Sequence, residues 1–232
     1  DLNALIQKYP QASASQDAFF LLGSVYSQQA LDLSQAGKKA EAQPFRDKAK
    51  VIFDQLAKRE GNPVTANESL FALAETWFNA GFYDEAIETY RDVRPKQEVV
   101  QILRAQAEKV QAQLAAQVSR QEDTSFSKSE MDRLKAQLAA VSEGADLMVA
   151  GYLRMAQAYF ERGWYDVCRA ICRHLMAFGD ADRRQQADYL LINTHLQEGD
   201  PARAAEEFDG FQQTFGADAP IVRVRALQQL VE

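Results

Sequence analysis

The side chains best suited to chemistry in this sequence are two cysteines and two histidines. Cys168 and Cys172 lie four residues apart, which places both thiols on one face of a helix. A zinc site needs four ligands, and no further cysteine or well-spaced histidine completes one. His174 is two residues from Cys172 and points elsewhere on a helix. We therefore predict two small buried thiols in a helix interface, with no metal site and no cofactor.

The carboxylates are numerous, but the sequence does not show any two of them converging as acid–base catalysis requires. Phosphate-binding loops, dinucleotide fingerprints and zinc-protease motifs are absent from the sequence. We therefore predict that the protein is not an enzyme. A cluster of arginines has two interpretations: contact with an anion or acidic peptide, or a solvated helix face with ion pairs, which we favour. Its members are Arg162, Arg169, Arg173, Arg183 and Arg184.

The composition fits a helical chain with a packed core. Hydrophobic residues make up 47% of the 232 positions, and 33 acidic against 26 basic residues give a net charge of −7. This charge argues against nucleic acid and against an anionic membrane surface as the main partner. No apolar run is long enough for a transmembrane segment. The sequence begins at Asp1 without a signal peptide, so we expect a piece of a longer or processed chain.

Side-chain sizes recur at fixed intervals in three segments. Each has an anchor residue, a partner twelve positions earlier and a glycine five positions before the anchor. In chain order the sets are Ala74, Gly81 and Ala86; Ala156, Gly163 and Cys168; Ile192, Gly199 and Ala204. Two further positions, three residues after the partner and four after the anchor, hold Trp77 and Tyr90, Tyr159 and Cys172, and His195 and Phe208. The pattern predicts antiparallel helix pairs, with each glycine ending a first helix and His195 in a packing position.

This pattern resembles the tetratricopeptide repeat (TPR), whose signature is W-x2-L-G-x2-Y followed by an alanine and, four residues on, a large residue. LFALAETWFNAGFYDEAIETY and YLRMAQAYFERGWYDVCRAIC match well. DYLLINTHLQEGDPARAAEEF matches less well because Ile192 is bulky. The resemblance implies an all-α fold, an α-α superhelix (a TPR-like solenoid) of antiparallel helix hairpins, over residues 1–232.

Residues 15–60 are predicted to form a lengthened repeat. Gly23 and Ala49 are 26 residues apart, where the other repeats have twelve, so both helices are expected to be longer and to turn near Gly37. The small residue Gly23 should let the second helix, with Ala49 and Phe53, approach closely. Pro44 predicts a kink or a late start of that helix.

Residues 97–143 match no repeat and are predicted to form an irregular long helical hairpin, which either packs or projects. A capping box of Ser127 and Glu130 is expected to open its second helix, and self-association through this hairpin is a further hypothesis. Regular repeats are predicted over 67–94, 146–178 and 182–214. We expect the end of a preceding repeat over 1–12 and a terminal helix over 220–232.

The first helices should line the concave side of such a solenoid and supply its binding face. An aromatic row there could grip a peptide; alternatively, Phe71, Phe78 and Phe160 pack between repeats. TPRs that clamp a C-terminal carboxylate use Lys and Asn on this face, and apolar residues replace the first such lysine here. The predicted face comprises Phe20, Ser24, Glu68, Phe71, Glu75, Phe78, Asn79, Leu153, Gln157, Phe160, Tyr189 and Asn193.

These features favour a protein–protein interaction scaffold that binds a segment of an unidentified protein or peptide. The alternative is a module that binds a glycan or another cell-envelope ligand, because sugars stack on aromatic faces. Short phrases such as LIQKYP and FDGFQQTFG resemble repeats in bacterial cell-envelope proteins. That likeness implies a periplasmic or envelope-associated protein, with the cytoplasm as the alternative.

Overall fold

The fold is all-α. The computed structural model describes residues 13–58 and 62–216, which contain helices and turns but no β-strand. The segments predicted over 1–12 and 220–232 lie outside these residues. The chain divides into two compact units: unit 1 comprises Asp1–Thr76 and Asp92–Met148, and unit 2 comprises Trp77–Arg91 and Val149–Glu232. Within each unit, successive helices pack on one another, as expected for a helical-repeat protein.

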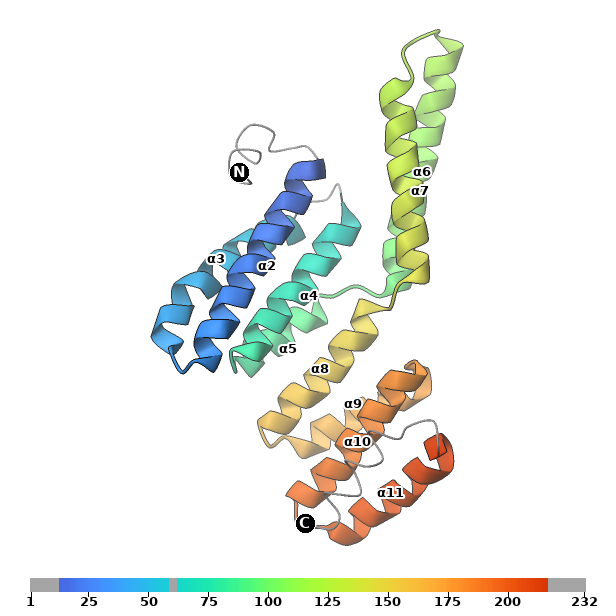
Figure 1. The fold of residues 1–232 in the computed structure, drawn as a ribbon. Coiled ribbons are helices and arrows are strands. Elements are labelled where there is room, and N and C mark those ends of the chain that lie inside the picture. The colour runs from blue at the N-terminus through green and yellow to red at the C-terminus, as the bar shows by residue number, and fades with distance from the viewer. Residues whose placement is uncertain (1–12, 59–61, 217–232) are drawn as a thin grey trace. The chain divides into compact units, whose positions relative to one another are not determined.

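Unit 1 holds the first helix that the structure describes, with the helices packed near it, and a long hairpin (Figure 1). Its helices are α2 (Ser13–Gln35), α3 (Lys39–Ala57), α4 (Pro63–Asn79) as far as Thr76, α6 (Lys96–Ser119) and α7 (Ser125–Glu143). Unit 2 holds α5 (Tyr83–Arg91), α8 (Leu147–Glu161) from Val149, α9 (Tyr165–Phe178), α10 (Ala181–Gln197) and α11 (Pro201–Phe215). In the described ranges, none of the helices combines the length and apolar character needed to cross a bilayer.

The contact between α2 and α3 confirms the expected close approach at Gly23. A Cβ atom on Gly23 would lie 2.8 Å from Cε1 of Phe53, and Ala49 and Phe53 are fully buried. The two helices turn at Gly37, where φ is 76°, a value that favours glycine. Pro44 lies inside α3, which begins at Lys39, so the late start is wrong. The helix continues through the proline, although Pro44 lacks the N–H that would bond to the carbonyl of Ala40.

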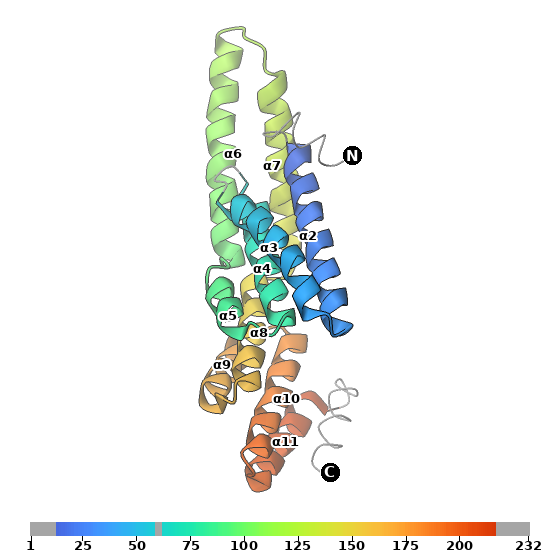
Figure 2. The ribbon, with the colours of Figure 1, turned by 90° about the vertical axis from the view of Figure 1, so that its left-hand side faces the viewer.

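Helices α2 and α4 lie side by side and run in the same direction (Figures 1 and 2). Near their starts, Nδ2 of Asn62 donates to Oε1 of Gln16 at 3.2 Å. Near their ends, the hydroxyls of Ser27 and Thr76 are 2.7 Å apart. Asn62 also caps α4, because its Oδ1 accepts from the backbone N–H of Thr65 at 3.2 Å. These contacts align consecutive first helices of the predicted repeats.

The hairpin of α6 and α7 packs at its base and extends freely towards its tip. Val99, Leu103 and Leu134 form a buried cluster, against which Val64 of α4 packs. Oδ1 of Asn62 accepts from Nε2 of Gln137 at 3.1 Å. At the tip, Phe126 is 78% exposed. The two alternatives for this hairpin therefore each describe one half of it.

The predicted capping box at the start of α7 is wrong. The helix begins at Ser125, and Oδ1 of Asp123 accepts from the backbone N–H of that residue at 2.9 Å. Ser127 is buried inside the helix, and Glu130 binds Arg133, whose Nε donates to it at 2.9 Å. An aspartate two residues before the helix therefore performs the role that the sequence pattern assigned to Ser127.

In unit 2, α5 packs directly on α8, although the α6–α7 hairpin separates them in the sequence. A Cβ atom on Gly151 would lie 3.4 Å from Cδ1 of Tyr90, and Nη2 of Arg91 donates to the hydroxyl of Tyr159 at 2.9 Å. The hairpin is thus inserted between two helices that contact each other. Further along, α10 and α11 share a core of Ile192, Ala204, Phe208 and Phe211.

The turns after α4 and α8 have similar backbone geometry, as the repeat pattern predicts, and similar ring spacings, although the first ring pair is edge-on after α4 (86°) and stacked after α8 (23°). The ring centroids of Trp77 and Phe82 are 5.8 Å apart, as are those of Tyr159 and Trp164. Phe78 and Tyr83 are 5.5 Å apart, as are Phe160 and Tyr165. Gly81 and Gly163 have φ values of 81° and 73°. After each glycine the next N–H bonds back to the helix, as in a Schellman motif.

Two predictions from the sequence, the buried thiols and the packing position of His195, are confirmed in unit 2, where the structure also shows how α11 is capped. Cys168 and Cys172 are free thiols with no exposed surface. Asp200 caps α11, because its Oδ1 accepts from the backbone N–H of Arg203 at 3.1 Å, and Pro201 occupies the first helical position. His195 is 3% exposed, in agreement with a packing role.

Candidate functional site

In unit 1, the predicted binding-face residues lie on α2 and α4. Phe20 is half-buried, with its ring centroid 5.7 Å from that of Phe53, so part of it belongs to the α2–α3 interface. The hydroxyl of Ser24 donates to the backbone carbonyl of Phe20 at 3.0 Å. Phe71 and Glu75 are half-buried, and Glu68 is exposed. This part of the face therefore combines half-buried rings with carboxylates.

In unit 2, the predicted residues differ widely in exposure. Phe78 and Phe160 are half-buried and Asn79 is exposed. The guanidinium of Arg154 lies 5.2 Å from the Phe78 ring centroid, and Nη1 of the same arginine donates to Oε1 of Gln157 at 3.0 Å. An arginine on an aromatic face is a favourable cation–π contact, so one side of Phe78 is already covered.

The remaining predicted residues of unit 2 offer less surface. Leu153 is 6% and Asn193 7% exposed. Nδ2 of Asn193 donates to the backbone carbonyl of Tyr189 at 3.1 Å, and the half-buried Tyr189 packs against the α10–α11 core. These three side chains make their contacts mainly within unit 2.

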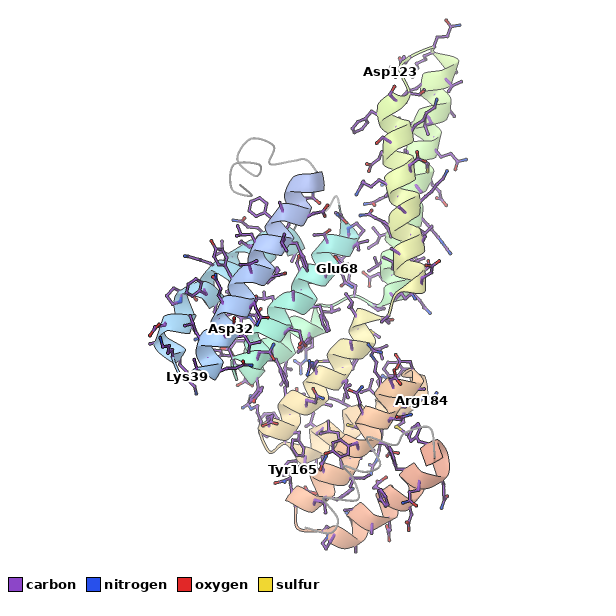
Figure 3. All side chains as sticks on the ribbon, in the orientation of Figure 1. Asp32, Lys39, Glu68, Asp123, Tyr165 and Arg184 are labelled. Atoms are coloured by element: carbon purple, nitrogen blue, oxygen red, sulfur yellow. The ribbon has the colours of Figure 1, made fainter. Side chains whose placement is uncertain are left out.

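Unit 1 also contains a cleft, which we call the hairpin-base cleft, of about 270 Å³. It lies where α4 meets the start of α6 and the end of α7, and Glu68 is on the side of α4 that lines it (Figure 3). Most of its wall is apolar. The lining residues are Val64, Asn67, Glu68, Lys96, Val99, Ala140, Val141, Gly144, Ala145 and Leu147.

Hydrogen bonds between distant residues fix the shape of this cleft. Nζ of Lys96 donates to the backbone carbonyls of Ser142 at 2.5 Å and Gly144 at 2.7 Å, where a cation suits the end of α7. Asp146 accepts from the backbone N–H of Lys96 at 3.2 Å and from that of Met148 at 2.9 Å. The Asp146 carboxylate thus caps both α6 and α8, and it joins the segment before α6 to the segment after α7 at the hairpin base.

A second set of bonds joins α4 to the segment before α6. Oδ1 of Asn67 accepts from the backbone N–H of Arg94 at 2.7 Å, and its Nδ2 donates to the carbonyl of the same residue at 3.2 Å. Asn67 is 6% exposed, so these bonds replace lost contacts with water. They place α4 beside the hairpin base.

Glu68 is a charged residue of the cleft for which the described part of the chain supplies no ion-pair partner. Although the residue is exposed, neighbouring protein atoms partly desolvate its carboxyl group, and this burial, with the negative charge of Asp17, raises the pKa of Glu68. Within residues 13–58 and 62–216, none of the lysines or arginines forms an ion pair with Glu68. The cleft therefore presents an apolar wall and a negative charge.

Most arginines of the predicted cluster form ion pairs with carboxylates of unit 2. Arg162 pairs with Asp84, and Arg169 with Asp166 and Glu198. Nη1 of Arg183 lies 2.6 Å from Oδ2 of Asp180. These contacts favour a solvated, ion-paired helix face over an anion site.

Unit 2 contains a set of titratable side chains in which Asp188 and Glu207, which the sequence pattern did not identify, join His195 and Cys172. Asp188 on α10 is 5% exposed, and burial, with the nearby charge of Glu207, raises the pKa of Asp188 to about 7. Nε2 of His195 lies 3.8 Å from Oε1 of Glu207. The pKa of Cys172 is also raised, through its contact with Cys168 and through burial, which keeps the thiol protonated.

This set does not form a metal centre. In the part of the chain that the structure describes, no three histidine, cysteine or carboxylate side chains are placed to hold a metal ion. The one sequence signal for Asp188 is its register. It lies sixteen residues before the anchor Ala204, where the other two repeats have Leu70 and Tyr152.

No protein-family model matches the sequence, and a search of curated proteins gave no significant match.

Proposed function

We propose that the chain is a TPR-like scaffold, built of antiparallel helix hairpins of which some are lengthened, and that it binds a segment of a partner protein rather than catalysing a reaction. The proposed binding face of each unit is that of its first helices: α2 and α4 as far as Thr76 in unit 1, and the end of α4 with α8 and α10 in unit 2. The observation that carries the proposal is that the five aromatic side chains assigned to this face are all half-buried. They are Phe20, Phe71, Phe78, Phe160 and Tyr189.

Half-buried aromatic rings suit this role for a physical reason. Packing of one side against the protein holds the ring in place, so little side-chain entropy is lost when a partner covers the other side. Large rigid rings also dominate the energetics of protein interfaces. The repeated ring pairs around Phe78 and Phe160 support a register in which equivalent side chains present equivalent surfaces.

The glycan-binding alternative has less support. A sugar needs an open ring face, and Arg154 lies over the ring of Phe78. Location in the periplasm or at the cell envelope belongs to the same proposal, and fractionation of the native source tests it.

The experiment is affinity capture with tagged chain from the native source. The double variant Phe71→Ala and Phe78→Ala should lose a partner that the parent chain captures. Phe126→Ala is the matched control, because that ring is exposed at the hairpin tip, outside the proposed face. Asn79→Glu is a second test, since the exposed Asn79 can change without removing core contacts. Equal capture of every partner by parent and face variants, with circular dichroism unchanged, would contradict the proposal.

A further inference from the structure

We propose that the hairpin-base cleft binds one apolar side chain of the partner segment, and that Glu68 at its edge binds a lysine or arginine next to that side chain. This inference rests on the proposed scaffold function and names the chemistry of the partner.

The size of the cleft points to a single side chain. Its volume of about 270 Å³ is below the roughly 300–1,000 Å³ typical of sites for whole small molecules. Its walls include Val64 from α4, Val99 from α6 and Val141 from α7, together with Leu147 after the hairpin. An aliphatic or aromatic side chain would gain hydrophobic stabilisation there from three directions.

The cleft is also held open in advance. Lys96 bridges to the end of α7, Asp146 caps two helices, and Asn67 clasps the segment before α6. None of these groups has to be released when a side chain enters. Preorganisation of this kind lowers the cost of binding.

The charges select a cationic neighbour. Lys96, the cation that lines the cleft, already donates to two backbone carbonyls, and it compensates the negative end of α7. The negative charge of Asp17 is felt by Arg133 as well as by Glu68, whereas Glu68 has no cation of its own among the described residues. A lysine or arginine of the partner would relieve this repulsion and form a charge-assisted hydrogen bond. An acidic partner would add to the repulsion.

The test selects peptides from a phage-displayed random library on the full chain and measures the affinity of synthetic, fluorescein-labelled copies. We expect enrichment of an apolar residue beside a lysine or arginine. Glu68→Lys and Ala140→Phe, which reverses the charge and fills the cleft, should each weaken binding by roughly tenfold or more. Two matched controls should leave affinity unchanged: Glu108→Lys, an exposed charge reversal on α6, and Ala139→Phe, an exposed position next to Ala140 outside the lining.

The outcomes separate this inference from the scaffold proposal. Peptides that bind both cleft variants as tightly as the parent, but lose affinity for Asn79→Glu, overturn the cleft and retain the scaffold. Enrichment of acidic peptides also overturns the cleft. If no peptide is enriched and the captured partners ignore the face variants, the scaffold proposal fails as well. Circular dichroism and urea unfolding establish that each variant is folded.

Discussion

Replacing Gly23 by alanine tests the closest contact between α2 and α3. The new methyl carbon would lie 2.8 Å from Cε1 and 3.0 Å from Cζ of Phe53, and 3.1 Å from Cγ2 of Ile52. Carbon atoms in contact normally sit about 3.5–4.0 Å apart. Phe53 has no exposed surface and Ile52 is 8% exposed, so neither side chain can move into solvent. The substitution therefore overpacks the interface.

The expected magnitude follows from two opposing effects. Overpacking a well-filled core costs about 1–3 kcal/mol, while glycine to alanine within a helix gains about 1 kcal/mol. Gly23→Ala should therefore lower the free energy of unfolding by about 0–2 kcal/mol. Gly210→Ala on α11 measures the gain in helix propensity alone, because no neighbouring heavy atom lies within 4 Å of its Cβ position and overpacking does not arise. It should be about 1 kcal/mol more stable than the parent.

The assay is urea unfolding followed by circular dichroism at 222 nm, which reports on helix. The free energies of unfolding of each variant and of the parent are compared at urea concentrations within their transitions. The double variant Gly23→Ala, Phe53→Leu identifies the cause. If the ring causes the loss, alanine at position 23 should cost less in the leucine background than in the parent. A stability gain for Gly23→Ala equal to that of Gly210→Ala would refute the close packing of α2 on α3.

Three further predictions concern buried side chains. Burial raises the pKa of Asp188 to about 7, so the folded chain should lose stability as the pH rises from about 4 to about 7. Asp188→Asn should remove this loss. In urea titrations its free energy of unfolding should exceed that of the parent by up to about 4 kcal/mol at about pH 8 but not at about pH 4. A difference that does not change with pH would contradict the raised pKa of Asp188. Asn67→Ala should lower the free energy of unfolding by about 1–3 kcal/mol in the same assay, because it leaves the backbone N–H and carbonyl of Arg94 unpaired. A loss within experimental error would argue against these two hydrogen bonds. Tyr90 is 1% exposed, so Tyr90→Ala should lower the free energy of unfolding by about 3–5 kcal/mol. The loss should be larger than that for Trp77→Ala, because Trp77 is only half-buried; the reverse order would contradict the observed burial.

The parts of the fold that depend on local contacts were predictable from the sequence. Gly81 and Gly163 predicted the helix ends because a left-handed residue is needed there and glycine supplies it. The bonds of these turns join residues three to five positions apart, so a short sequence window contains all the partners. The cap of α11 is local in the same sense, because Asp200 accepts from the backbone N–H of Arg203, three residues on, and Pro201 follows it directly.

The predicted cap at Ser127 failed because a neighbouring residue competes for the same role. Ser127 and Glu130 fit a capping box by spacing, but Asp123 accepts from the first backbone N–H of α7, that of Ser125, from the preceding turn. Asp188 falls in a register position that is otherwise apolar, and periodicity alone does not say whether a carboxyl group there is buried. Its raised pKa depends on α11, which brings Glu207 near.

The two candidate binding surfaces differ in how the sequence specifies them. The aromatic row repeats with the helix pairs, so a pattern search finds it, although only the structure shows that Leu153 and Asn193 are covered. The hairpin-base cleft depends on bonds between residues 27 to 50 positions apart, such as Asn67 with Arg94 and Lys96 with Asp146. No short-range rule connects such pairs. An insertion outside the repeat pattern thus supplies one wall of a cleft whose other wall, on α4, follows the pattern, and Glu68 is the residue at which the two meet.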